Sequence, residues 1–253
     1  MDRRIGGRKL VNNRHSPDPI GAWSFTEGLD EILKKSCQLM AKQGFHGTSM
    51  RDLAQETGRS LSGLYHYFRS KEDLLFLINF GGFTTLNTAW RELVDTLEQP
   101  REKLYAFIYF HLGYFVEHMD EMRLMTWGTQ VLHVEKARMI QKLKDQYTDA
   151  LKEIVMELHK AGAGRDFDDK RLSRETYLLF GMMNWTFSWY DPHQHGSVAE
   201  LIRDIYRTFL RGISNGEYDE GDLDRMESAV GEIFEQTKKP SMWARTVVVE
   251  PDH

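Results

Sequence analysis

Hydrophobic side chains recur along this chain three and four residues apart, the spacing of one helix face, from about residue 24 onward. Alternation of apolar and polar residues, the pattern of a half-buried strand, is almost absent. The pattern therefore predicts an all-α fold. It predicts helices over residues 24–43, 48–58, 60–68, 70–97, 102–118, 134–160, 170–190 and 197–213, an aromatic-rich segment at 120–132, and one more helix in the tail through Leu223, Met226, Val230, Ile233 and Phe234.

The segment 48–75 predicts two short helices joined by a tight turn, followed at once by a third. Ser49 with Asp52, and Ser70 with Asp73, have the serine-x-x-acid spacing of a capping box. Gly58 is placed to end the first short helix, since glycine takes the left-handed conformation without strain. Two short helices around a glycine turn indicate a helix-turn-helix, whose second helix enters the DNA major groove. A structural helical corner that binds nothing has the same spacing, so the spacing alone leaves both interpretations open.

The residue identities in this segment add a resemblance. GRSLSGLYHYFRSKEDLL, residues 58–75, resembles the signature of the TetR (tetracycline repressor) family of transcriptional regulators, and the match covers about fifty residues from Thr26 onward. The family's turn glycine, leucine–tyrosine pair, phenylalanine and serine-lysine-glutamate stand here at Gly58, Leu64–Tyr65, Phe68 and Ser70–Lys71–Glu72. The sequence departs from the commonest pattern at Leu61, Ser62 and Gly63, where lysine, glycine and threonine are frequent. These departures fall on the surface that would face DNA, so they leave the operator sequence open.

The resemblance implies an N-terminal three-helix, helix-turn-helix DNA-binding head and a larger helical body that binds a ligand and dimerises. The domains expected are a flexible basic arm at 1–23, the DNA-binding domain at 24–72, the ligand-binding and dimerisation domain at 73–216, and a C-terminal tail with one helix at 217–253. The resemblance further implies a homodimer in which the helices at about 170–190 and 197–213 form a four-helix bundle with their copies. A helix that is apolar nearly all round also needs a second surface to cover it.

The family motif, carried over residue by residue, gives candidate DNA contacts. Phosphate contacts position the protein and base-edge contacts choose the sequence. An arginine can bind the two acceptors of guanine, and a leucine can meet a thymine methyl group. The expected phosphate contacts are Thr48, Tyr65, Tyr67 and Lys71. The candidates for base edges and for the start of the recognition helix are Arg51, Arg59, Ser60, Leu61, Ser62, Gly63 and His66.

The charge distribution agrees with a DNA partner for one end of the chain. The net charge of the 253 residues is −5, but residues 1–75 hold twelve Lys and Arg against nine Asp and Glu, a balance of +3. The rest of the chain therefore carries −8. A basic end joined to an acidic body is consistent with a protein that touches phosphate with one region only. The basic arm either lies in the adjacent minor groove or is a tail with incidental charge.

A second, weaker resemblance concerns the ligand. NWTFSWYDP, residues 184–192, is similar to the branch of the family that includes fatty-acid and steroid-degradation regulators, which implies an acyl-CoA thioester as effector. Another hydrophobic or aromatic small molecule is the alternative. Small-molecule sites are mostly apolar with a few polar groups. The side chains that would line such a site are Phe107, His111, Tyr114, Trp127, Met182, Met183 and Trp185, and ordinary core packing is the alternative for each of them.

Other classes of protein have less support. The chain has no GxSxG, Walker, HExxH or CxxC motif, so we expect a regulator rather than an enzyme, with no cofactor and no metal. Asp191, His193 and His195 are the alternative metal ligands. The single cysteine, Cys37, lies on an apolar helix face and excludes an internal disulfide, and no apolar run approaches the ~20 residues of a membrane span, so a cytoplasmic protein is expected. Gly81–Gly82, inside a predicted helix, indicates either a hinge or a close helix crossing.

Overall fold

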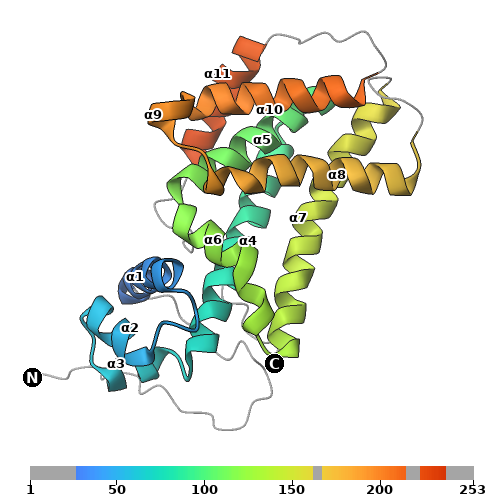
Figure 1. Ribbon diagram of the computed structural model, residues 1–253. Helices are drawn as coiled ribbons and strands as arrows, with labels where there is room; N and C mark the ends of the chain where they lie inside the picture. Colours follow the sequence, from blue (N-terminus) through green and yellow to red (C-terminus); the bar gives the residue numbers. More distant parts are fainter. Residues whose placement is uncertain (1–26, 162–166, 215–222, 238–253) are drawn as a thin grey trace, which may run out of the picture.

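The computed structural model describes residues 27–161, 167–214 and 223–237 (Figure 1). Within these ranges the chain forms helices and no strand, which confirms the predicted all-α class. The basic arm at 1–23, the predicted cap residue Ser24 and the segment 238–253 lie outside the described residues.

Three helices form the N-terminal head: α1 (Glu27–Gln43), α2 (Met50–Thr57) and α3 (Leu61–Tyr67). Their apolar faces meet in one core, to which α2 and α3 contribute Leu53 and Leu64. The α1 stripe predicted from the sequence is buried there, at Leu29, Ile32, Leu33, Cys37 and Met40.

Local signals set the boundaries of α2 and α3. The Ser49 Oγ accepts the Asp52 N–H at 3.2 Å, and an Asp52 carboxylate oxygen accepts the Ser49 N–H at 2.8 Å, so the predicted capping box forms. Gly58 ends α2 with φ +67°, a conformation that other L-residues adopt at a cost. The Ser60 Oγ then accepts the Gly63 N–H at 3.0 Å and starts α3. The helix-turn-helix therefore follows directly from residues close in sequence.

The helix α4 (Lys71–Val94) connects the head to the body and runs beside α7 (Val134–Lys160) (Figure 1). It continues without a break through Gly81 and Gly82, which are both buried. The Asn87 side chain donates to the Phe83 carbonyl of its own helix at 2.8 Å and to the Leu143 carbonyl of α7 at 3.0 Å. Between α4 and α7 come α5 (Pro100–Glu117), α6 (Met119–Trp127) and the 3₁₀ turn η1 (Gly128–Val131).

The second half of the body contains α8 (Asp169–Asn184), η2 (Trp185–Ser188), α9 (Pro192–His195), α10 (Val198–Ile213) and α11 (Leu223–Thr237). The single helix predicted over 170–190 is wrong beyond Asn184, where the chain tightens into a 3₁₀ turn. The Thr186 hydroxyl donates to the Met183 carbonyl at 2.7 Å and so competes with the regular helical N–H. The helix predicted to reach residue 97 likewise ends at Val94, and the Thr96 hydroxyl donates to the Leu93 carbonyl at 2.7 Å.

The tail helix α11 lies over α5 of its own chain. Phe234 packs against Tyr109 and Phe110, and a Cβ atom at Gly113 would lie 3.1 Å from the Phe234 ring. Arg203 of α10 adds ion pairs to Glu227 and Asp224 of α11, the latter at 2.8 Å. The tail helix predicted from the sequence is thus an integral part of the body.

We predict that Phe234→Ala lowers the free energy of unfolding by about 3 kcal/mol, because a large aromatic ring leaves a void when it is truncated. Urea denaturation followed by circular dichroism measures the change. Glu232→Ala, on the exposed side of the same helix, is the control and should stay within about 0.5 kcal/mol of the wild type. Equal stabilities of the two variants would show that α11 does not depend on this contact.

Candidate DNA-binding surface and effector core

The candidate recognition surface is the exposed side of α2 and α3. Leu64 and the following Phe68 point into the head core, which leaves Ser62, Tyr65 and His66 of α3 exposed. The Ser60 Oγ, which caps α3, lies 3.1 Å from the Ser62 Oγ, so the first turn carries short hydroxyl side chains. The sequence candidates that are exposed on this surface are Arg51, Arg59, Ser60, Ser62, Tyr65 and His66.

Three further candidates are half-buried. Leu61 packs against the head core, so only part of its side chain is available to meet a base. Gly63 lies close to the capping Ser60, since a Cβ there would be 3.1 Å from the Ser60 Oγ. Tyr67 lies over α1, where a Cβ at Gly28 would be 3.7 Å from its hydroxyl and 3.0 Å from Arg59 Nη2. Gly28 thus lets both side chains lie across α1.

Thr48 and Lys71, two of the expected phosphate contacts, make internal contacts. The Lys71 ammonium donates to the carbonyls of Phe45 and Thr48, the latter at 2.5 Å, and lies 4.3 Å from the centre of the Phe45 ring. Partial burial lowers the pKa of Lys71. Thr48 is buried, and its hydroxyl donates to the Gly44 carbonyl at 2.8 Å. In this structure both side chains brace the loop before α2.

In the body, His111 of α5 is the centre of a buried polar contact among aromatic rings. Its Nε2 lies 3.0 Å from the Asn184 Oδ1 of α8, and its Nδ1 lies 3.2 Å from the Tyr147 hydroxyl of α7. An amide oxygen only accepts, so the proton is on Nε2 and the tyrosine hydroxyl donates to Nδ1. The Phe115 ring stacks on the imidazole at 4.1 Å between centroids. Burial lowers the pKa of His111 to about 3, so the imidazole is neutral at neutral pH.

The structure brings only some of the predicted effector residues together. Phe107 stacks on His111 and also contacts Tyr147, whereas Tyr114 and Met183 are buried in the wider core. Met182 is half-buried. Trp127 ends α6, and its side chain lies outside what the structure describes.

Trp185 is in a different place from the other effector candidates. Its side chain is 58% exposed on η2 and contacts Phe187, so it does not lie with His111 in the interior. Sequence reasoning did not select Asn184 or Phe180, which do contact the His111 cluster. The available signal was an asparagine at the border of an apolar helical stretch, since a buried amide needs a partner.

Two buried side chains of α4 carry hydrogen-bonding atoms that are not paired within the described residues. Asn79 Oδ1 and Thr85 Oγ1 are buried and have no hydrogen-bond partner among the described residues. The Thr126 and Thr176 hydroxyls, by contrast, donate to the carbonyl four residues earlier in their helices. Buried polar groups are nearly always paired, so these atoms are candidates for a hydrogen bond to a bound molecule.

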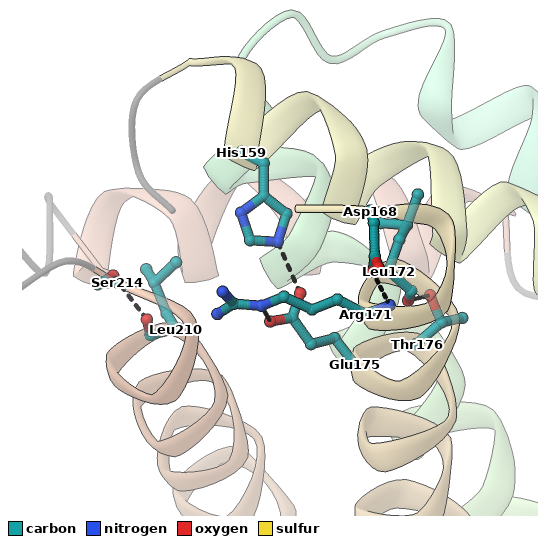
Figure 2. A network of polar contacts seen from close by, with 8 residues as sticks. All are labelled: His159, Asp168, Arg171, Leu172, Glu175, Thr176, Leu210 and Ser214. Carbon is teal, nitrogen blue, oxygen red and sulfur yellow. Dashed lines mark hydrogen bonds and ion pairs between the residues drawn. The ribbon is translucent and has the colours of Figure 1, made fainter. Parts of the chain in front are cut away.

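A second polar network fixes the start of α8 against the end of α7 (Figure 2). The Glu175 carboxylate accepts from His159 Nε2 at 2.6 Å and from Arg171 Nε at 2.8 Å. Figure 2 shows the Arg171 guanidinium pointing toward the end of α10, where the Ser214 hydroxyl donates to the Leu210 carbonyl at 2.6 Å. The network holds α8 in one orientation.

That orientation leaves large apolar side chains of α8 and η2 outward. Tyr177 is 63% exposed, Leu178 65% and Trp189 44%, on the same stretch as Trp185. A Cβ at Gly181, between them in sequence, would meet nothing within 4 Å. Several large apolar side chains exposed within one short stretch are a candidate for a protein–protein contact.

The histidines and acidic side chains of the described residues form no metal site. No group of three or more His, Cys, Asp or Glu side chains there is arranged to hold a metal ion. His195 Nδ1 lies 3.2 Å from the Asp191 carbonyl, and Asp191 caps α9. Of the described helices, none is both long and apolar enough to cross a membrane.

Comparison with known proteins agrees with this division into head and body. The family model for bacterial regulatory proteins of the tetR family matches residues 32–78, and the model for the tetracyclin repressor-like C-terminal domain matches residues 97–213. The first match falls on the helix-turn-helix and the start of α4, and the second on the body from just before α5 to the end of α10. The chain belongs to the TetR family of transcriptional regulators, whose N-terminal helix-turn-helix binds DNA.

Individual relatives are distant but similar over most of their length. The transcriptional repressor NicS of Pseudomonas putida is 25% identical over 179 residues, which are 70% of this chain and 81% of that protein. The crystal structure of the regulator PfmR from Thermus thermophilus has a TM-score of 0.65 and 28% identity, covering 71% of this chain and 97% of that one. AibR, solved in complex with isovaleryl coenzyme A and operator DNA, has a TM-score of 0.65 and 23% identity, covering 72% and 97%.

The burial of His111 gives a prediction for the pH dependence of stability. The unfolded chain binds a proton on this histidine below about pH 6.5, whereas the folded chain does not until about pH 3. The unfolded state therefore gains protons first, and stability is lost as the pH falls. Between about pH 6 and about pH 5, the wild type should lose roughly 1 kcal/mol more than His111→Gln. Urea denaturation at each pH measures the free energy of unfolding of both proteins. Equal losses in the two proteins would show that His111 is protonated in the folded core as readily as in the unfolded chain.

Proposed function

We propose that this protein is a dimeric, ligand-responsive repressor that binds a near-palindromic operator and is released by an apolar effector of the acyl-CoA thioester class. The observation that carries the DNA half is the exposed polar surface of α2 and α3, with its arginines and hydroxyl groups on a rigid helix-turn-helix. In the recognition mode of this motif, α3 lies in the major groove and its N-terminal residues face base edges. Action on DNA agrees with a cytoplasmic location.

The DNA contacts divide by the exposure of the side chains. Arg51, Ser62 and His66 are exposed and are our candidates for base edges, with Arg59 placed toward α1. Tyr65 is 49% exposed and has the reach to donate to a phosphate. Thr48 and Lys71 act on phosphate only if they leave their contacts with the loop, so we assign them mainly to positioning α2. The arm at 1–23 is a further candidate for the minor groove.

The dimer would use the exposed apolar side chains of α8 and its extension η2, together with α10. Burying large apolar side chains stabilises association by about 25 cal/mol per Å² of apolar surface. A two-fold axis through this surface would present the two heads to one face of DNA, with their recognition helices about one DNA turn apart, ~34–36 Å, or somewhat more.

The effector would bind in the body between α4, α5, α7 and α8. The aromatic cluster around His111 offers an apolar environment, and the unpaired Asn79 and Thr85 atoms on α4 offer hydrogen bonds. A neutral His111 favours an uncharged polar group over a carboxylate, because a buried charge without a partner is costly. AibR, a distant relative in fold, is named as a complex with isovaleryl coenzyme A, which supports the thioester class. Another hydrophobic or aromatic molecule is the second candidate.

We predict that Arg51→Ala weakens binding to the specific operator by tenfold or more, since a bidentate base contact contributes about 1–3 kcal/mol. The probe is a fluorescent duplex from the region upstream of the protein's own gene, measured by anisotropy at low and at moderate salt. Arg91→Ala, an exposed arginine on the body end of α4, is the matched control and should bind as the wild type does. Unchanged affinity of Arg51→Ala would show that Arg51 does not contribute to operator binding.

We predict that Leu178→Glu gives a particle with the mass of one 29.6 kDa chain, whereas the wild type has twice that mass. Dimerisation would take the introduced carboxylate out of water without a partner for its charge, which is costly. Light scattering after size exclusion measures both. Lys142→Glu on the exposed side of α7 is the control, and a dimeric Leu178→Glu would show that the contact lies elsewhere.

The effector is tested on the preformed operator complex with straight-chain and branched acyl-CoA thioesters. Thioesters should release the DNA. Free coenzyme A should not, because it lacks an acyl chain to enter the apolar core, and the matching free acids should not, because they would bring a carboxylate into it. Release by the free acids alone would reject the thioester class. If no compound releases the DNA, the effector half of the proposal is wrong and the operator half is unaffected.

A further inference from the structure

The first turn of α4 contacts two separate parts of the molecule through three consecutive side chains. Lys71 reaches the loop before α2, while Glu72 and Asp73 reach the start of α7. Only residues 68–70 separate this turn from the end of α3. Any rotation of the turn relative to α7 therefore moves the recognition helix with it.

On the side of the head, the principal contacts of Lys71 are with backbone carbonyls and an aromatic ring. Its ammonium donates to two backbone carbonyls and lies over the Phe45 ring. The Thr48 carbonyl belongs to the residue before Ser49, which caps α2. The lysine thus ties the start of α2 to the start of α4.

On the side of the body, the Glu72 carboxylate accepts a hydrogen bond from the backbone at the start of α7. His133 is the N-cap of α7, and its own side chain makes no capping hydrogen bond. A Glu72 carboxylate oxygen accepts the His133 N–H at 2.8 Å, from 61 residues away in sequence. A negative charge at a helix N-terminus also interacts favourably with the helix dipole.

Lys136, in the first turn of α7, completes the contact. Its ammonium lies 2.5 Å from Asp73 Oδ1 and 3.4 Å from Glu72 Oε1. The Lys136 and Asp73 side chains are each 17% exposed, so this pair is shielded far more than an ordinary surface ion pair. Two acidic groups and one lysine therefore join the first turn of α4 to the first turn of α7.

We propose that Lys71, Glu72, Asp73, His133 and Lys136 form a joint that sets the orientation of the head on the body, with Lys136 as the positioning residue that carries movement of α7 to α3. The proposal rests on the proposed function in one respect: head orientation matters because it sets the spacing of two recognition helices on DNA. A merely stabilising ion pair would change the free energy of unfolding and leave the head orientation as it is. Loss of the joint would instead change the orientation of the head on the body.

The test is the distance distribution between spin labels on the head and the body, measured by double electron–electron resonance. Gln55→Cys on α2 and Glu153→Cys on α7 are both exposed label sites, and the native Cys37 is fully buried and stays unlabelled. Labelled chain is mixed with an excess of unlabelled chain, so that each particle reports one distance. The labelled protein with Lys136 intact should give one narrow distribution.

In Lys136→Met the distribution should broaden or split, while Lys136→Arg, which keeps the charge, should restore the narrow form. Lys142→Met removes a lysine from the exposed side of the same helix and should change nothing. Asp73→Asn should broaden the distribution as Lys136→Met does, and the double variant should add little, because both remove one interaction. Asp73→Asn also provides the test of the joint if Lys136→Met does not fold.

Operator affinity is measured in parallel with the same upstream duplex. If the competent head orientation falls to about a tenth of the molecules, binding weakens roughly tenfold. A narrow, unchanged distribution in folded Lys136→Met and Asp73→Asn overturns the joint. If the distribution broadens in Lys136→Met but the wild type itself binds no operator, the joint stands and the proposed function is rejected. The two failures are therefore distinguishable.

Discussion

The burial of α4 on nearly all its sides is the constraint on which the arrangement of the molecule depends. It contacts α1 of the head and α5, α6, α7 and α11 of the body. The buried residues of head and body accordingly form one continuous cluster. The head is held by this helix and by the contact of α1 with α6. The helix α3 and the core around His111 are therefore parts of one packed structure, not two units on a linker.

The elements that depend on neighbouring residues were predictable from the sequence. The capping box of Ser49 and Asp52, the left-handed Gly58 and the Ser60 cap involve partners within a few residues, and each forms as expected. The helix over 134–160 was predicted with its observed ends, because its apolar stripe is regular and its flanks are polar. Helix ends decided by a threonine hydroxyl, at residues 94 and 184, were missed.

Contacts between distant parts of the chain were not predictable in the same way. Asn184 pairs with His111 across 73 residues, and no local pattern marks either as the other's partner. Trp185 follows Asn184 directly, yet a tightened turn places it on the outer surface. Lys71 matches the family motif as a phosphate contact, but the structure shows it bound to backbone carbonyls of its own head. Residue type restricts the chemistry in each case, and only the tertiary arrangement selects the partner.

The enclosed imidazole of His111 has a spectroscopic consequence. Its Nε2 proton is held by an amide oxygen, and aromatic rings from α5, α7 and α8 surround the ring. Such a proton exchanges with water only when the surrounding helices separate, so its lifetime measures the opening of the core. In a proton nuclear magnetic resonance spectrum it would give a downfield signal apart from the backbone amides, as would the buried His159 Nε2 proton held by Glu175. One native histidine thus makes the opening of this interior directly observable, without any added label.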